Sequence, residues 1–177
     1  MNKNTKIIIG VMVVLLPLVV FLGILNFQQA QERLTYHIYG SFRVISGDSD
    51  IRVTLDDMIN MELVTFESNH RRAEGNFTGV RLTEILEFTE LDYSSSSSVV
   101  FFSYDGFSTA ISIADAQADG TFIIFEQDGL SLAENPDVDG NSRLWEEAPF
   151  RLVLLDDMFP QRWARYVIEI VLQQEEV

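Results

Sequence analysis

The feature that most constrains this chain is an uncharged apolar run from Ile7 to Phe27, close to its N-terminus. Two glycines, one proline and one asparagine are the only interruptions. Because an α-helix rises about 1.5 Å per residue, about 20 such residues cross the roughly 30 Å of bilayer hydrocarbon. We therefore expect a transmembrane helix over residues 7–27, preceded by a stub of residues 1–6.

The charges that flank the run indicate its orientation. Lys3, Lys6 and the amino terminus precede it, whereas Glu32 follows it. Because the positive flank stays in the cytoplasm, we expect a single-pass protein of the cell membrane whose C-terminal part is extracytoplasmic. The alternative is a cleaved signal peptide, but its apolar region is normally about 7 to 15 residues and ends at a small-x-small site. The segment Gln28–Ala30 matches such a site poorly.

The extracytoplasmic part is strongly acidic. Lys3 and Lys6 are the only lysines, so the part after the run holds ten arginines against 27 acidic residues, a net charge of −17. Nucleic acid binding needs clustered basic residues that neutralise phosphates, so we exclude DNA and RNA as partners. The surface suits cations, cationic partners or a salty medium, or it serves solubility alone.

The chain contains no cysteine. An exported domain without disulfides must be held together by its core, and thiolate metal sites are impossible. A domain of about 150 residues buries roughly 68 to 70% of its unfolded surface, which is enough to make this feasible.

Beyond the run, the pattern predicts an α+β domain over residues 34–177, joined by a polar linker of residues 28–33. Alternating apolar residues and turn residues predict short strands, and apolar residues at helical spacing predict few helices. We expect a mixed β-sheet. The predicted strands are residues 34–39, 51–53, 61–66, 99–103, 107–113, 121–126, 150–155 and 166–172.

Local motifs refine this prediction. Thr54 before two aspartates predicts a capped helix over 55–59, and a second amphipathic helix should start near Arg81. Asp105-Gly106 between apolar runs predicts a hairpin. The five serines Ser94–Ser98 are expected to form a surface loop.

Four motifs in order resemble a known family. They are Val53–Met58, Phe77–Leu82, Ser103–Ser108 and Ala148–Val153. This order is similar to the molybdopterin-binding domain of the sulfite oxidase superfamily, over about residues 34–173. The resemblance implies a mixed α+β domain around a curved sheet.

The chain departs from this family at the metal. Family enzymes bind molybdenum through one cysteine about a dozen residues before the glycine that corresponds to Gly79, and here that position falls near Glu67 or Ser68. A hydroxyl or carboxylate is a hard ligand, unlike a soft thiolate. The resemblance therefore leaves two alternatives: a surface turn of charged residues, or a cofactor site. The residues of that site would be Ser68 as an alkoxide ligand, with His70, Arg71 and Arg72 as donors to a cofactor phosphate.

A separate segment, residues 135–146, has the spacing of a calcium loop. Oxygen donors at positions 1, 3 and 5, glycine at position 6 and glutamate at position 12 are the ligands that this loop type requires. The candidate ligands are Asn135, Asp137, Asp139, the carbonyl of Asn141, and Glu146. An acidic turn is the alternative, because position 1 is not aspartate.

These observations favour a membrane-anchored binding or accessory domain that has lost redox catalysis. We expect no catalytic residues and no molybdopterin, and calcium is the candidate cofactor. One alternative is a molybdopterin-dependent oxidoreductase with a non-cysteine metal ligand. Another is a structural subunit of a membrane assembly, with a protein partner for the N-terminal helix.

Overall fold

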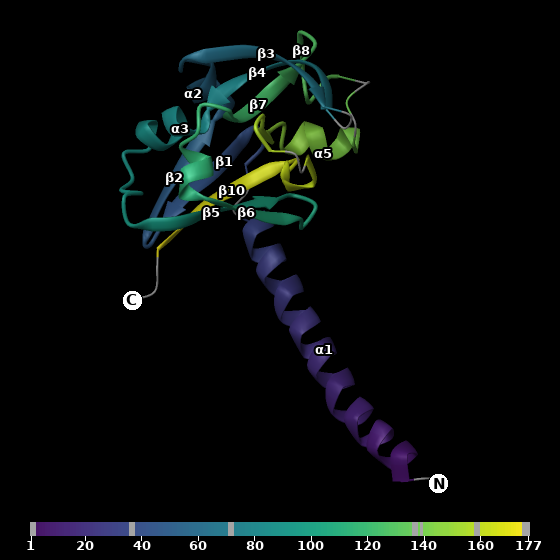
Figure 1. The fold of residues 1–177 in the computed structure, drawn as a ribbon. Coiled ribbons are helices and arrows are strands. Elements are labelled where there is room, and N and C mark those ends of the chain that lie inside the picture. The colour runs from purple at the N-terminus through teal and green to yellow at the C-terminus, as the bar shows by residue number, and fades with distance from the viewer. Residues whose placement is uncertain are drawn as a thin grey trace. The chain divides into compact units, whose positions relative to one another are not determined.

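The computed structural model describes residues 3–35, 38–70, 73–135, 138, 140–157 and 160–174. The chain divides into two compact units, Met1–Tyr36 and His37–Val177. The first unit is a single helix and the second is an α+β domain (Figure 1).

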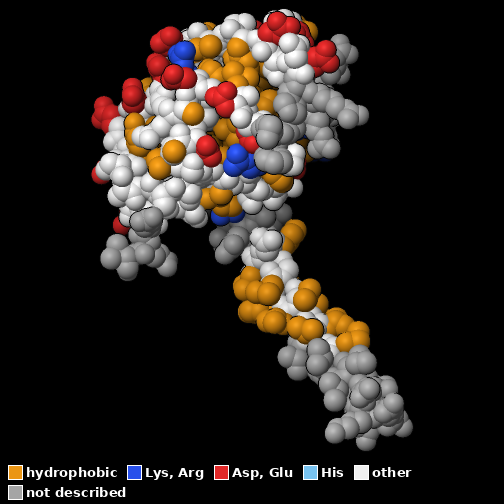
Figure 2. Space-filling model, in the orientation of Figure 1, with side chains coloured by type: hydrophobic (Ala, Val, Ile, Leu, Met, Phe, Trp, Pro, Cys, Tyr) orange, Lys and Arg blue, Asp and Glu red, His pale blue; other side chains and the backbone are white. Residues whose placement is uncertain are grey.

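The helix of the first unit is α1 (Lys3–Thr35), which includes the whole apolar run. Its apolar side chains between Met12 and Phe27 are exposed wherever they are described, and Figure 2 shows them gathered along the helix. The described residues contain no helix that is both long enough and apolar enough to cross a membrane. The anchor over residues 7–27 stays a prediction.

Helix α1 also continues through residues 28–33, where the sequence suggested a polar linker. The predicted strand over residues 34–39 is wrong. Leu34 and Thr35 are helical, and Ile38 and Tyr39 lead into a turn before the first strand. The alternating pattern was too short to distinguish a strand from the last turn of a long helix.

Sheet A has five strands in the order β2-β1-β10-β5-β6. β1 and β10 are parallel neighbours, and the other pairs are antiparallel. The sheet is therefore mixed, as expected. Its strands are β1 (Ser41–Ser46), β2 (Ser49–Thr54), β5 (Ser96–Ser103), β6 (Ser108–Ser112) and β10 (Val167–Gln174).

Sheet B follows the order β3-β4-β7-β8, with β9 also paired to β7. All its pairs are antiparallel. Its strands are β3 (Leu63–His70), β4 (Ala73–Arg81), β7 (Thr121–Gln127), β8 (Leu130–Ser131) and β9 (Arg151–Leu154).

Short helices connect these strands. They are α2 (Leu55–Ile59), α3 (Leu82–Phe88), α4 (Ile113–Ala116), α5 (Ser142–Glu147) and the 3-10 turn η1 (Pro160–Arg162). The predicted cap of α2 is confirmed. The Thr54 hydroxyl accepts from the Asp57 amide at 3.1 Å, and the Asp57 carboxylate accepts from the Thr54 amide at 2.8 Å. This capping box satisfies two backbone donors that a helix start leaves unpaired.

The core consists of aromatic and branched side chains from both sheets and the helices. Phe42 of β1 packs edge-on against Phe150, just before β9, with ring centroids 5.0 Å apart. Trp145 of α5 packs against Tyr166, next to β10, at 4.4 Å. All four rings are buried, so the segments before β9 and β10 are fixed by aromatic packing.

The α+β prediction is confirmed, with two sheets among the described residues in place of one. The hairpin around Asp105-Gly106 is confirmed as β5 and β6. The serine run is not all loop, because Ser96–Ser98 begin β5 and Ser96 is buried. Backbone pairing with β10 outweighed the turn preference of serine there.

Candidate functional site

Ser68 lies on β3 and is, with Glu67, one of the two positions near which the family resemblance places the metal-binding cysteine. It pairs with Gly75 across the β3–β4 ladder. Ser68 is 5% exposed, while its neighbours Glu67 and Asn69 are exposed. Because successive strand residues face opposite sides of a sheet, Ser68 belongs to the covered side.

Phe66 lies two residues before Ser68 and therefore on the same side of β3. Its ring centroid is 5.9 Å from that of Phe77 and 4.6 Å from that of Phe122. Phe77 and Phe122 are both buried. Ser68 thus shares its side of sheet B with an aromatic cluster.

Strand β9 brings a cation to this side. Arg151 lies opposite Ile124 of β7, which is two residues from Phe122 on the same strand. Cross-strand partners and alternate residues face the same side of a sheet, so Arg151 shares the side of Phe122. We call the group of Ser68, Phe66, Phe122 and Arg151 the Ser68 face.

Arg151 is 2% exposed, and its guanidinium carbon lies 5.6 Å from the ring centroid of Trp163. An arginine removed from water is costly unless its charge is compensated, and a tryptophan ring face supplies part of that compensation. The sequence prediction missed both residues. The available signal was a charged residue in the otherwise apolar strand Phe150–Leu155.

A carboxylate lies at the hairpin beside Ser68. Asp128, in the β7–β8 turn, accepts from the Asn76 amide at 2.9 Å and its own amide donates to the Asn76 carbonyl at 2.7 Å. Gly75 has a φ of 137°, and a Cβ built there would lie 2.8 Å from Asp128 Oδ2. The β7–β8 turn therefore fixes the hairpin next to Ser68 and adds negative charge there.

The other predicted cofactor residues are only partly described. His70 is the last residue of β3 and pairs with Ala73. Arg71 and Arg72 lie outside the described residues. Their role as phosphate donors stays a prediction.

The structure describes only some of the candidate calcium ligands. Asn135 is buried, and its side-chain amide donates to the Gln127 carbonyl at 3.0 Å. Glu146 is exposed on α5. Asp137 and Asp139 lie outside the described residues, so the loop is a prediction that the structure leaves untested.

Asn141 has a clear structural role. It is the N-cap of α5, where its side-chain oxygen accepts from the Arg143 amide at 3.1 Å. Its carbonyl accepts from the amides of Leu144 and Trp145. An ion at this loop would share the Asn141 carbonyl with the first turn of α5.

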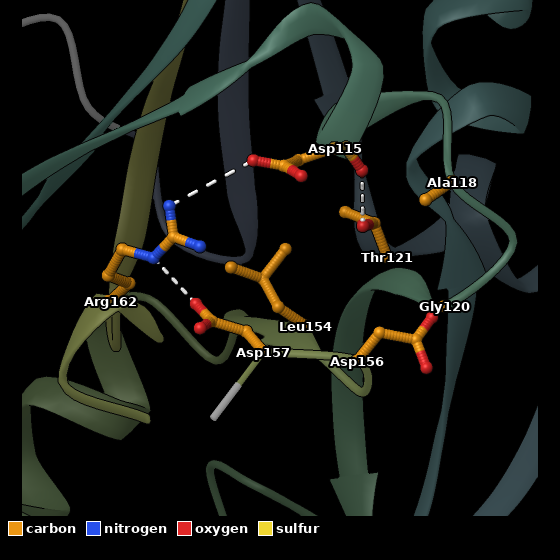
Figure 3. A pocket seen from close by; sticks show the side chains of 8 residues that line it. All are labelled: Asp115, Ala118, Gly120, Thr121, Leu154, Asp156, Asp157 and Arg162. Carbon is orange, nitrogen blue, oxygen red and sulfur yellow. Dashed lines mark hydrogen bonds and ion pairs between the residues drawn. The ribbon is translucent and has the colours of Figure 1, made fainter. Parts of the chain in front are cut away.

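A pocket of about 120 Å³ lies away from the predicted residues (Figure 3). It is formed by α4, the segment before β7, the end of β9 and η1. Its lining residues are Asp115, Ala118, Gly120, Thr121, Leu154, Asp156, Asp157 and Arg162.

An ion-pair network crosses this pocket. Arg162 Nε donates to Asp157 Oδ2 at 2.6 Å, and Arg162 Nη1 lies 3.9 Å from Asp115 Oδ2. The hydrogen bond to Asp157 is the main cause that raises the pKa of the Arg162 guanidinium above its usual value. Figure 3 shows that Asp156 points away from Arg162. Two of the three carboxylates are therefore paired within the pocket, which limits what they can do for a ligand.

No family model matches this sequence, and no curated protein matches it. Among solved structures, the chain is similar to "Sulfane Dehydrogenase SoxCD from Paracoccus pantotrophus", with a TM-score of 0.57 at 12% sequence identity over 76% of this chain. The two chains share a fold. The match spans 38% of the SoxCD chain, which is less than half of its length. This agrees with the sulfite-oxidase-like fold expected from the motifs, at the level of fold alone.

The residues of the Ser68 face do not fit a cysteine-ligated molybdenum centre. The chain has no thiol, and the side chain at the expected position is a buried hydroxyl. A hydroxyl must lose a proton of high pKa to become an anionic ligand, and Asp128 at the same hairpin disfavours a second negative charge. A serine hydroxyl is a hard oxygen donor, which is unlike the soft thiolate that the family uses.

Proposed function

We propose that this chain is a membrane-anchored, extracytoplasmic binding or accessory domain that has a sulfite-oxidase-like fold but carries out no redox chemistry. The observation that supports it is Ser68, a buried hydroxyl on β3 in a chain without cysteine. The scaffold is retained while the soft ligand that would bind the metal is absent.

The packing of the Ser68 face supports the same proposal. Phe66 and Phe122 have ring centroids only 4.6 Å apart, and Phe122 and Arg151 are almost fully buried. Side chains therefore fill this part of the face. Such packing is consistent with a binding or accessory domain, which does not require an open cofactor cleft on this face.

The proposed anchor rests on the sequence and on α1. Residues 7–27 carry no charge, with two lysines on one flank and acids only on the other. The described apolar side chains from Met12 to Phe27 are 40% exposed or more, which in water would be costly over such a length. A bilayer removes that cost.

Oxidised-pterin fluorescence tests the loss of the cofactor. The full chain is purified in mild detergent from a host that makes molybdopterin, then denatured and oxidised, and the released pterin is measured against protein. We expect no pterin above the level of a matched detergent blank. One pterin per chain would contradict the proposal, whether or not metal accompanies it.

The alternative function is a molybdopterin-dependent oxidoreductase that uses Ser68 as its ligand. The burial of Ser68 near the position of the family's metal ligand is the observation on which this alternative rests. The variant Ser68→Ala separates the two functions. The oxidoreductase predicts loss of bound molybdenum, whereas the accessory domain predicts no change in metal content.

A third alternative is a structural subunit of a membrane assembly, in which α1 packs against helices of a protein partner. Cross-linking in native membranes followed by purification in mild detergent tests it. A single defined partner recovered in fixed ratio would support this subunit role, and a chain that purifies alone would contradict it.

A further inference from the structure

One end of sheet A collects exposed aromatic and apolar side chains. β1 begins at Ser41, which pairs with Thr54 at the end of β2. β10 begins at Val167, which pairs with Ser103 at the end of β5. Since β1 and β10 are parallel and in register from Arg43 and Glu169 onward, these strand ends lie at the same end of the sheet.

Three exposed side chains occupy this end. Ile38 and Tyr39, just before β1, are 56% and 62% exposed. Phe107, in the β5–β6 turn, is 42% exposed. The turn itself is held to the sheet, because the Ser103 amide donates to the Phe107 carbonyl at 2.9 Å. We call Ile38, Tyr39 and Phe107 the apolar rim.

The length of the covalent chain sets an upper limit on the distance between β1 and the end of α1. Thr35 ends α1 and Ser41 begins β1, so six Cα steps separate them, which is at most about 22 Å. The eight residues from Gln28 to Thr35 are helical and rise about 12 Å beyond the apolar run. The polar layer of a bilayer leaflet is about 5 to 8 Å thick, so Thr35 stands about 4 to 7 Å beyond it. The six Cα steps to Ser41 are long enough for the chain to return to the headgroups.

We propose that the apolar rim lies in the headgroup layer of the membrane that holds α1, so that sheet A stands with this end on the lipid. The inference rests on the proposed anchor. Tyrosine and other aromatic side chains favour this layer because one part of the side chain is apolar and another is polar.

The charge of the domain selects the type of lipid. A domain with a net charge of −17 is repelled by anionic headgroups, and Asp105 is exposed at the tip of the turn that carries Phe107. A zwitterionic headgroup presents a cationic amine that such a carboxylate can approach. The rim therefore fits zwitterionic lipid.

The absence of cysteine makes a clean test available. Single-cysteine variants Tyr39→Cys and Phe107→Cys of the full chain are labelled with an environment-sensitive dye and reconstituted into phosphatidylcholine vesicles. Asp48→Cys, in the β1–β2 turn at the opposite end of sheet A, is the positional control. Phe88→Cys is matched to Phe107 in type and, at 46%, in exposure.

Quenching by a headgroup nitroxide lipid is then compared among the four positions. We expect at least threefold stronger quenching and a blue-shifted emission at positions 39 and 107 relative to 48 and 88. Equal quenching at all four positions in chains that float with the vesicles overturns the inference and leaves the anchor intact. Chains that fail to float overturn the anchor, and the inference with it.

Discussion

At the scale of single residues, backbone contacts restrict what several positions accept. Gly79 of β4 is the sharpest example. A Cβ there would overlap the carbonyl oxygen of Ile123 and lie 2.6 Å from the Ile124 Cα. Both obstacles are backbone of the neighbouring strand β7, so no side chain can move aside. Glycine at this position allows β4 and β7 to approach.

Gly79→Ala should therefore be strongly destabilising, by about 3 kcal/mol, because overpacking against backbone has little room to relax. Gly47→Ala is the control, since its φ of 57° costs a side chain about 1 kcal/mol and no atom lies within 4 Å of the added Cβ. Urea unfolding of the two variants measures the difference. Equal losses would mean that the β4–β7 approach is not close in solution.

Asp92 offers a residue-scale pH test. The Asp92 carboxylate accepts hydrogen bonds from the Ser94 side chain and from the Ser94 amide, the latter at 2.9 Å. These bonds, the side-chain bond most of all, hold the pKa of Asp92 below its usual value. A depressed pKa contributes stability that is present above the ordinary carboxyl pKa and lost as pH falls through the folded one. NMR titration should show the Asp92 pKa rising partway in Ser94→Ala, where only the amide bond remains. An unchanged pKa in that variant would contradict this account.

At the scale of elements, β10 organises sheet A because it pairs with β1 on one side and β5 on the other. Ile170 lies in its middle, is 0% exposed, and pairs with Val44 and Phe101. Ile170→Ala should cost about 2 to 5 kcal/mol through lost burial and a residual cavity. Leu155→Ala, at a 38% exposed position, should cost less than about 1 kcal/mol. Similar losses in thermal unfolding would contradict the central position of β10.

The loop of residues 135–146 makes a prediction at the same scale. If calcium binds there, added calcium raises the melting temperature of the full chain by mass action, and chelator lowers it. Asp137→Asn combined with Asp139→Asn should abolish the shift, while Asp119→Asn, on another loop, should keep it. No shift in the unmodified chain would show that the loop is an acidic turn.

The elements that the sequence predicted well are those with a local cause. The capped helix after Thr54 and the turn at Asp105-Gly106 need only neighbouring residues, and both are confirmed. Ser96 begins a strand because it pairs with a distant strand, and Thr35 is helical because it ends a long helix. Local sequence patterns therefore predicted the wrong secondary structure at both positions. The split into two sheets could not be predicted, because it depends on which distant strands pair.

The candidate site shows the same division. Motif order placed the candidate position near Glu67 or Ser68, and the fold adds that Ser68 is buried on β3 while Glu67 is exposed. Arg151 and Trp163 were missed because they reach one another only through the fold. The pocket around Arg162 was missed for the same reason, since α4 and η1 are far apart in sequence.

At the scale of the whole molecule, the domain combines a fold similar to that of SoxCD with an acidic composition, and it contains no cysteine thiolate for a metal. Figure 2 shows acidic side chains spread over the visible face of the domain. Such a surface disfavours anionic ligands, and it either suits cationic partners or serves solubility alone.

The molar ratio of molybdenum to protein in the natively purified full chain tests the central claim most directly. Mass spectrometry of the metal, with the protein quantified by amino-acid analysis, gives this ratio without any assumption about substrate. The account predicts a ratio indistinguishable from that of a buffer blank. One molybdenum per chain, retained through gel filtration, would contradict it.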